Sequence, residues 1–155
     1  MAGTSSPPRP GIGQRELADL ASTLERALSW IRRALRPTEW SAVALSTLAA
    51  VDRLGPLRIT DLVARERITQ PGMTGLVARL EAAGLVQRRQ DPTDGRATLV
   101  EVTPVGTAYL VSLHRQRAAT LAEHLRRLDL DEQRLLVAAV GALHSLTDQP
   151  LDEGA

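Results

Sequence analysis

The sequence predicts a mainly α-helical fold with one small β-hairpin. Apolar residues recur at steps of three and four along most of the chain, which places them on one side of successive helices. Capping residues and the helix breakers Gly and Pro separate these periodic stretches. One polar segment, DPTDGR at residues 91–96, joins two short alternating runs, and its Asp-Pro and Asp-Gly pairs predict the turn of a hairpin.

The N-terminal part is predicted to hold a tail and two helices. Residues 1–13, MAGTSSPPRPGIG, are rich in Pro, Gly and Ser, and we expect them to be disordered. A long amphipathic helix is predicted over residues 14–36, where a proline follows. Thr38 is the candidate N-cap of a second helix, which ends at Gly55 and Pro56.

Two short helices with a tight connection follow, and this arrangement is a helix-turn-helix. Thr60 is the candidate N-cap of a helix from Asp61 to about Glu66. Thr69 caps a second helix that runs to about Ala83 and carries Pro in its first turn. The residues expected to pack this motif are Leu62, Val63, Ile68, Met73, Leu76, Val77 and Leu80.

A hairpin and two further helices complete the predicted order. Strands are expected over residues 85–90 and 97–102, and they form a wing beside the helix-turn-helix. Thr103 and Pro104 begin a long helix to about residue 127, and Asp131 begins the last one. We therefore interpret residues 37–103 as a winged helix-turn-helix domain.

The first and last helices have apolar faces, and within one chain they have only each other to cover them. This pattern predicts self-association. Residues 148–155 form an acidic tail.

Composition excludes several classes of function. The chain has 155 residues and no Cys, so disulfides, thiol chemistry and zinc–thiolate sites are ruled out. His114, His124 and His144 lack metal-ligand spacing, and no phosphate-binding loop or nucleophile motif is present. We therefore expect no enzyme activity, no cofactor and no metal. No apolar run reaches the roughly 20 residues of a membrane span and no leader opens the chain, so we expect a cytoplasmic protein without a membrane partner.

Residues 57–106 carry a family resemblance. The TQPGMTGLVARLEAAGLVQR stretch, the D-P-x-D-x-R segment at residues 91–96 and the closing V-x-V-T-P-x-G together resemble the MarR family of winged-helix transcriptional regulators. The resemblance implies a homodimer formed through a helical dimerisation region of residues 14–36 and 104–147. It further implies that this dimer binds double-stranded DNA, with each recognition helix in a major groove and each wing in the adjacent minor groove. It also implies a repressor that releases DNA when a small-molecule effector binds.

The wing contributes two candidate DNA-binding residues. Arg96 lies at the predicted hairpin tip, and the electronegative minor groove attracts an inserted Arg. In the family pattern the Asp of D-x-R orients this Arg, which implies that Asp94 orients Arg96. A solvated turn with an ion pair of little value is the alternative.

The recognition helix contributes further candidates. Gln70 can pair with adenine, Thr74 can contact a base or a thymine methyl group, and Thr69 can contact a phosphate while it caps the helix. Arg79 could reach a phosphate or pair with Glu81 or Asp61. For Met73 we favour core packing.

Charge and glycine content limit these contacts. Arg88 and its neighbour Arg89 alternate faces of the first wing strand, so only one of them can face DNA, and we assign Arg88. The chain departs from the pattern of the family that it resembles, in which many members carry an Arg at the position of Gly75. A second glycine lies at position 72. Residues 37–104 hold eight Arg against eight acidic residues, so affinity for DNA must come from the placement of charges rather than from net charge.

A winged-helix protein-interaction module with weak or lost DNA binding is the alternative function.

The resemblance also places an effector pocket where the dimerisation helices meet the winged helix. Trp30, Trp40, Tyr109 and His114 are its candidate lining, because pockets for small molecules are mostly apolar and aromatic. The alternative for the two Trp residues is that they fill the core.

Overall fold

The computed structural model describes residues 11–35, 38–95 and 97–148. Most of the tail expected at residues 1–13, most of the acidic tail and the wing-tip Arg96 lie outside these residues. The chain divides into two compact units, residues 1–36 and residues 37–155. We describe each unit by itself.

The first unit contains helix α1 (Gln14–Ala34). The backbone N–H of Gly13 donates to Glu16 Oε2 over 2.9 Å and so closes the N-terminus. Within its unit α1 buries none of its residues. Its exposed leucines follow the predicted spacing of three and four, and they are Leu17, Leu20, Leu24 and Leu28.

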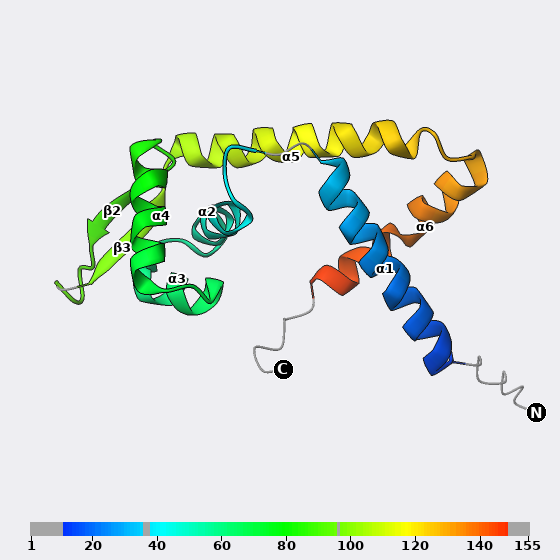
Figure 1. Ribbon diagram of the computed structural model, residues 1–155, viewed down its shortest axis with the longest axis horizontal. Helices are drawn as coiled ribbons and strands as arrows, with labels where there is room; N and C mark the ends of the chain where they lie inside the picture. The colour runs from blue at the N-terminus through cyan, green and yellow to red at the C-terminus, as the bar shows by residue number, and fades with distance from the viewer. Residues whose placement is uncertain (1–10, 36–37, 96, 149–155) are drawn as a thin grey trace, which may run out of the picture. The chain divides into compact units, whose positions relative to one another are not determined.

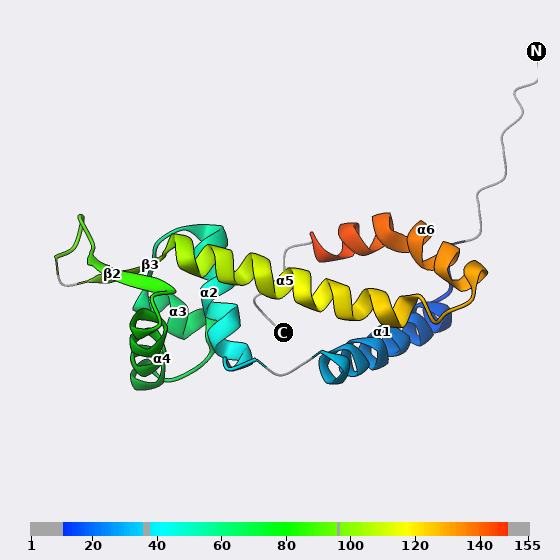
Figure 2. The ribbon, with the colours of Figure 1, turned by 90° about the horizontal axis from the view of Figure 1, so that it is seen from above.

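The second unit has the predicted mainly helical order with a small sheet. Its elements are α2 (Ala42–Leu54), β1 (Leu57–Arg58), α3 (Ile59–Glu66), α4 (Gln70–Ala82), β2 (Val86–Gln90), β3 (Thr98–Val102), α5 (Pro104–Leu125) and α6 (Leu130–Thr147). The strands form an antiparallel sheet in the order β1-β3-β2. The β2–β3 hairpin projects past α4, and α5 begins beside the sheet and runs away from it (Figures 1 and 2). The winged helix-turn-helix fold is confirmed.

Three predicted helix starts were wrong by one to three residues. Ser41, not Thr38, caps α2 by accepting a hydrogen bond from Ala44 N–H. Helix α3 begins at Ile59, so Thr60 lies inside the helix rather than capping it. Asp129, not Asp131, caps α6, and Glu132 completes a capping box by accepting from the Asp129 N–H.

Strand β1 was not predicted, and its length explains why. It has two residues, whose partners on β3 are Val100 and Leu99. Two residues cannot display an alternating pattern, so only pairing with a strand about 40 positions later defines this element.

The core of the second unit forms where α2, α3, α4 and the sheet converge. Met73, Val77 and Leu80 of α4 are 0% exposed, as is Leu62 of α3. The residues expected to pack the helix-turn-helix all belong to this core or contact it, with Val63 and Ile68 partly buried. Burial of one face of α4 therefore fixes which of its residues face outward.

The start of α5 is locked against the end of the α4 segment. Thr103 Oγ1 donates to the carbonyl oxygen of Gly84 over 2.6 Å and accepts from the N–H of Gly106 over 3.1 Å. A Cβ atom on Gly106 would lie 2.1 Å from the carbonyl oxygen of Leu85. This contact requires glycine and explains the last residue of the T-P-x-G sequence.

Substituting Gly106 therefore tests the junction. We expect Gly106→Ala to destabilise the protein by about 3 kcal/mol, because the Leu85 carbonyl belongs to the backbone and cannot rotate away. Gly75→Ala is the matched control: its Cβ would meet nothing within 4 Å, and helix propensity alone should stabilise the protein by about 1 kcal/mol. Chemical denaturation measures both changes. Equal stability of the two variants would show that α5 does not pack as described.

Candidate DNA interface and ligand pocket

The outer face of α4 carries short polar residues around its N-terminus. Thr69 caps the helix by accepting from the N–H of Gly72 over 3.3 Å. The hydroxyl of Thr74 donates to the carbonyl oxygen of Gln70 over 2.9 Å, and both side chains are exposed. Gly75 is exposed beside them, and no atom lies within 4 Å of its would-be Cβ. This open, polar end of a helix has the shape and chemistry to enter a major groove.

Met73 is fully buried, as the sequence predicted. Arg79 is exposed on the outer face of α4, and within the described residues it forms no ion pair. Neither of the two partners considered for it, Glu81 and Asp61, holds it. Its guanidinium is thus available to a phosphate.

Arg88 connects the last turn of α4 to strand β2. Its Nε donates to Glu81 Oε2 over 2.7 Å, its backbone N–H donates to Glu81 Oε1 over 3.1 Å, and Nη2 also contacts Oε2. These hydrogen bonds are the main reason that the pKa of Glu81 is lowered and the pKa of Arg88 is raised. Arg88 would have to share its guanidinium between Glu81 and DNA. Sequence reasoning missed this pair because Glu81 and Arg88 are seven residues apart, on different elements.

The wing hairpin holds its loop in a set of short hydrogen bonds. Asp94 is exposed, and its carbonyl oxygen accepts from the N–H of Ala97 over 2.8 Å. The Gln90 side chain donates to the carbonyl oxygen of Gly95 over 2.7 Å. Arg96, which lies between Gly95 and Ala97 in the chain, is outside the described residues.

Asp91 at the base of the loop is the buried acid of the wing. It is 7% exposed, and its carboxylate accepts hydrogen bonds from Thr93 and Arg58. Those from Thr93 are the largest cause of a pKa lowered to about 2. A lowered pKa means that the ionised Asp91 stabilises the fold above its ordinary pKa of 3.8, and that this contribution is lost as the pH falls toward 2.

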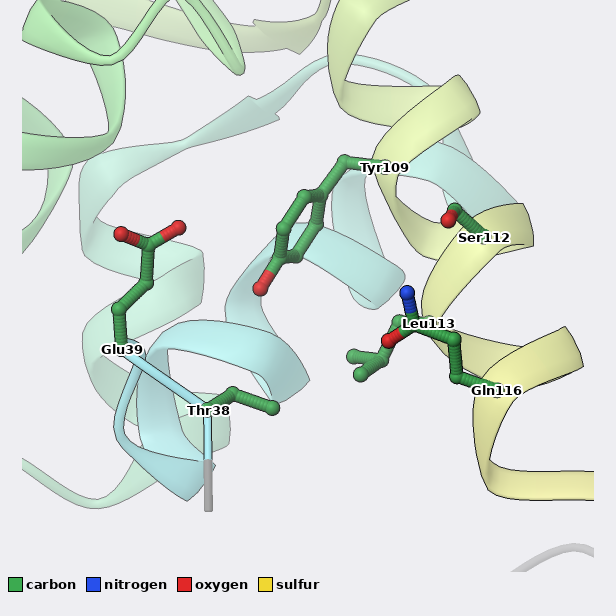
Figure 3. Close-up of a pocket in the computed structure, with 6 residues that line it drawn as sticks. All are labelled: Thr38, Glu39, Tyr109, Ser112, Leu113 and Gln116. Atoms are coloured by element: carbon green, nitrogen blue, oxygen red, sulfur yellow. The ribbon is translucent and has the colours of Figure 1, made fainter. Parts of the chain in front are cut away.

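A pocket of about 210 Å³ lies between the segment before α2 and the first half of α5. The Tyr109 ring reaches from α5 toward Thr38 and Glu39 (Figure 3). The pKa of Tyr109 is raised, first by burial and then by the negative charge of Glu39. The lining consists of Thr38, Glu39, Tyr109, Ser112, Leu113 and Gln116.

Of the four residues predicted to line a pocket, Tyr109 lines this one. Trp40 packs against the core, and His114 is exposed on α5 and is not part of the lining. Trp30 belongs to α1, in the other unit, and is 41% exposed. The sequence analysis missed the polar lining, because Thr38, Ser112 and Gln116 come together only through the packing of α5.

Across residues 11–35, 38–95 and 97–148, no three His, Asp or Glu side chains are placed to hold a metal ion. None of the helices there is both long and apolar enough to cross a bilayer.

A helix-turn-helix with an open polar recognition helix and an adjacent β-hairpin defines the class of winged-helix DNA-binding regulators. A family model described as MarR family matches residues 40–98. A *Mycobacterium bovis* protein named an uncharacterized HTH-type transcriptional regulator is 36% identical over 136 residues, which cover 85% of this chain and 95% of that protein. The chain belongs to the MarR family of transcriptional regulators.

Solved structures agree with this assignment at the level of the fold. The transcriptional regulator Tm0710 from *Thermotoga maritima* superimposes with a TM-score of 0.71 at 21% identity, covering 84% of this chain and 95% of that one. *Bordetella bronchiseptica* BpsR, whose DNA binding is described as regulated by 6-hydroxynicotinic acid, gives a TM-score of 0.52 at 23% identity. That superposition covers 92% of this chain and all of the other.

Proposed function

We propose that this protein is a homodimeric repressor that binds a pseudo-palindromic operator and releases it when a small molecule occupies the α5 pocket. The observation that carries the proposal is that α4 is amphipathic. Its apolar face is buried in the core, and its exposed face presents Gln70, Thr74 and Arg79 beside the wing. All three side chains are exposed, and the hydroxyl of Thr74 bonds to the backbone of its own helix.

DNA recognition divides between helix and wing in this proposal. Gln70 and Thr74 contact base edges in the major groove, and Thr69 and Arg79 contact phosphates. Arg96, oriented by Asp94, enters the minor groove next to it. A dimer would place its two recognition helices in successive major grooves, with half-sites about 34 Å apart.

A homodimer is supported by apolar surface at both ends of the chain. Within single units, α1 and α6 bury none of their residues. The exposed apolar residues of α6 include Leu135, Leu136, Val140 and Leu143. Exposed apolar residues that recur along a whole helix are typical of an interface.

The effector part of the proposal is supported by the pocket and by the regulation described for BpsR. The pocket lies on α5, whose first turn is locked to the end of the α4 segment. A ligand that shifts α5 would therefore shift the recognition helix. The spacing of the two helices in a dimer would then depart from that of the operator.

One observation favours a second function, a protein-interaction module with weak DNA binding. Arg58, Arg88 and Arg89 all form ion pairs with acidic residues of the same domain, which leaves fewer cations for phosphates. The binding experiment that follows separates the two functions.

The DNA-binding role is tested by fluorescence anisotropy with a duplex from the protein's own promoter and a scrambled duplex, at two salt concentrations. We expect tight, salt-sensitive binding with a preference for the promoter. Arg96→Ala should weaken promoter binding by about 1–3 kcal/mol. Arg126→Ala, which removes an equal charge from an exposed pair with Glu123, should not. Equal, weak binding of wild type to both duplexes would favour the interaction module.

The dimer is tested by placing a charge on each apolar face. Leu24→Asp and Leu143→Asp should each give monomeric or unfolded protein, because an unpaired carboxylate in an apolar interface is strongly destabilising. Leu54→Asp is the control, since Leu54 is 52% exposed at the end of α2, outside both helices. Analytical ultracentrifugation distinguishes the 16.7 kDa monomer from the dimer. A well-folded dimer in either test variant would mean that the interface lies elsewhere.

The effector pocket is tested by filling it. A library of small aromatic compounds is screened for loss of DNA binding by wild type, and each active compound is then measured on Ser112→Leu. We expect this variant to bind DNA but no longer respond, because the larger side chain occupies the cavity. His114→Leu, a change on α5 outside the lining, should respond normally. A library without any active compound, or an undiminished response in Ser112→Leu, would remove the pocket from the proposal.

A further inference from the structure

The carboxylate of Asp91 is saturated by four hydrogen-bond donors. Oδ2 accepts from Arg58 Nε over 2.8 Å and lies 2.7 Å from Arg58 Nη2. Oδ1 accepts from the backbone N–H of Thr93 over 2.8 Å and from its hydroxyl over 2.7 Å. With 7% exposure and both oxygens occupied, Asp91 is not arranged to bind an external group.

Arg58 and Asp91 belong to different parts of the domain. Arg58 ends β1 and is the N-cap residue of α3, the first helix of the helix-turn-helix. Asp91 directly follows β2 and begins the wing loop. Their contact spans 33 positions of sequence and joins the wing loop to the helix on which α4 packs.

Other hydrogen bonds of the wing loop have a different effect. The Asp91 N–H donates to the Ala97 carbonyl oxygen over 3.0 Å, and the Ala97 N–H donates to the Asp94 carbonyl oxygen over 2.8 Å. These bonds give the loop its shape, but both ends of each lie within residues 91–97. The Arg58–Asp91 contact instead joins the loop to the start of the helix-turn-helix.

We propose that Arg58 and Asp91 are positioning residues that hold the wing loop at the angle from which Arg96 enters the minor groove. The inference rests on the proposed DNA-binding function. A loop that is held in place before binding has already lost its conformational entropy during folding. A free loop loses that entropy when DNA binds, which weakens the binding. Arg58 accordingly acts through Asp91, and its guanidinium pairs with this carboxylate rather than with a phosphate.

For Asp91→Asn, a positioning role and simple electrostatics predict opposite changes in DNA affinity. Removal of a negative charge beside a polyanion should strengthen DNA binding if charge alone matters. If Asp91 positions the wing, the same change should weaken binding, because an amide cannot accept on both sides and turns an N–H₂ group toward Arg58 or Thr93. The expected loss is about tenfold, the cost of ordering about one loop residue at binding.

The experiment measures promoter binding for wild type, Asp91→Asn, Arg96→Ala and the double variant, with circular dichroism melts to show that each is folded. Asp91→Asn should weaken promoter binding when it is introduced into wild type. It should have little further effect in the Arg96→Ala background, because Asp91 acts through the Arg96 side chain. Glu101→Gln is the matched control: it removes one acid from the neighbouring strand, where Glu101 pairs with Arg89 over 3.4 Å inside the hairpin, and should bind at least as well as wild type.

Two outcomes would overturn the inference while leaving the proposed function intact. One is Asp91→Asn binding as tightly as wild type or more tightly, and the other is an equal loss with and without Arg96. Wild type that fails to prefer the promoter contradicts the proposed function itself. If Asp91→Asn does not fold, Arg58→Lys replaces it, because Lys keeps the charge and loses the two-nitrogen fork. Promoter binding by Arg58→Lys equal to that of wild type would likewise overturn the inference.

Discussion

Burial of one face of α4 is the constraint on which the rest of the domain depends. Met73, Val77 and Leu80 are 0% exposed, and they pack among residues from α2, α3 and the sheet. A helix fixed in this way cannot rotate without exposing these side chains, each of which contributes about 1.5–3 kcal/mol by its burial. The polar face with Gln70 and Thr74 is consequently presented in one orientation. The exposed Gly75 lowers the stability of the helix because glycine has a low helix propensity, and the core contacts of its neighbours offset that loss.

Some arginines of the domain form ion pairs that join its elements, and others are exposed without such a pair. Arg88 joins the end of α4 to β2 through Glu81, and Arg58 joins the start of α3 to the wing through Asp91. The recognition helix, its supporting helix and the wing are thereby tied to each other at both ends of the motif. Arg79, with no ion pair inside the described chain, contrasts with both. A domain with no net charge over residues 37–104 can thus still present individual cations where a phosphate would lie.

Helix α5 connects the two halves of the proposed mechanism. Its first turn is fixed to Gly84 and Leu85 through Thr103, with no space for a side chain at Gly106. One to three turns further on, Tyr109, Ser112 and Gln116 line the pocket. The same rigid element therefore contacts both the exit of the recognition helix and the effector site that we propose.

The sequence by itself determined the fold class and the position of the recognition helix. Apolar spacing from Leu62 to Leu80, the Thr69 cap and the DPTDGR turn are local signals, and each is readable without knowledge of the rest of the chain. Thr38 and Thr60 were misjudged as caps: Ser41 caps α2, and α3 already begins at Ile59, so Thr60 lies inside that helix. Tertiary structure alone decided strand β1, the Glu81–Arg88 and Arg58–Asp91 pairs and the polar lining of the pocket. All of these join residues from different elements, and a contact between distant positions leaves no periodic trace in one sequence.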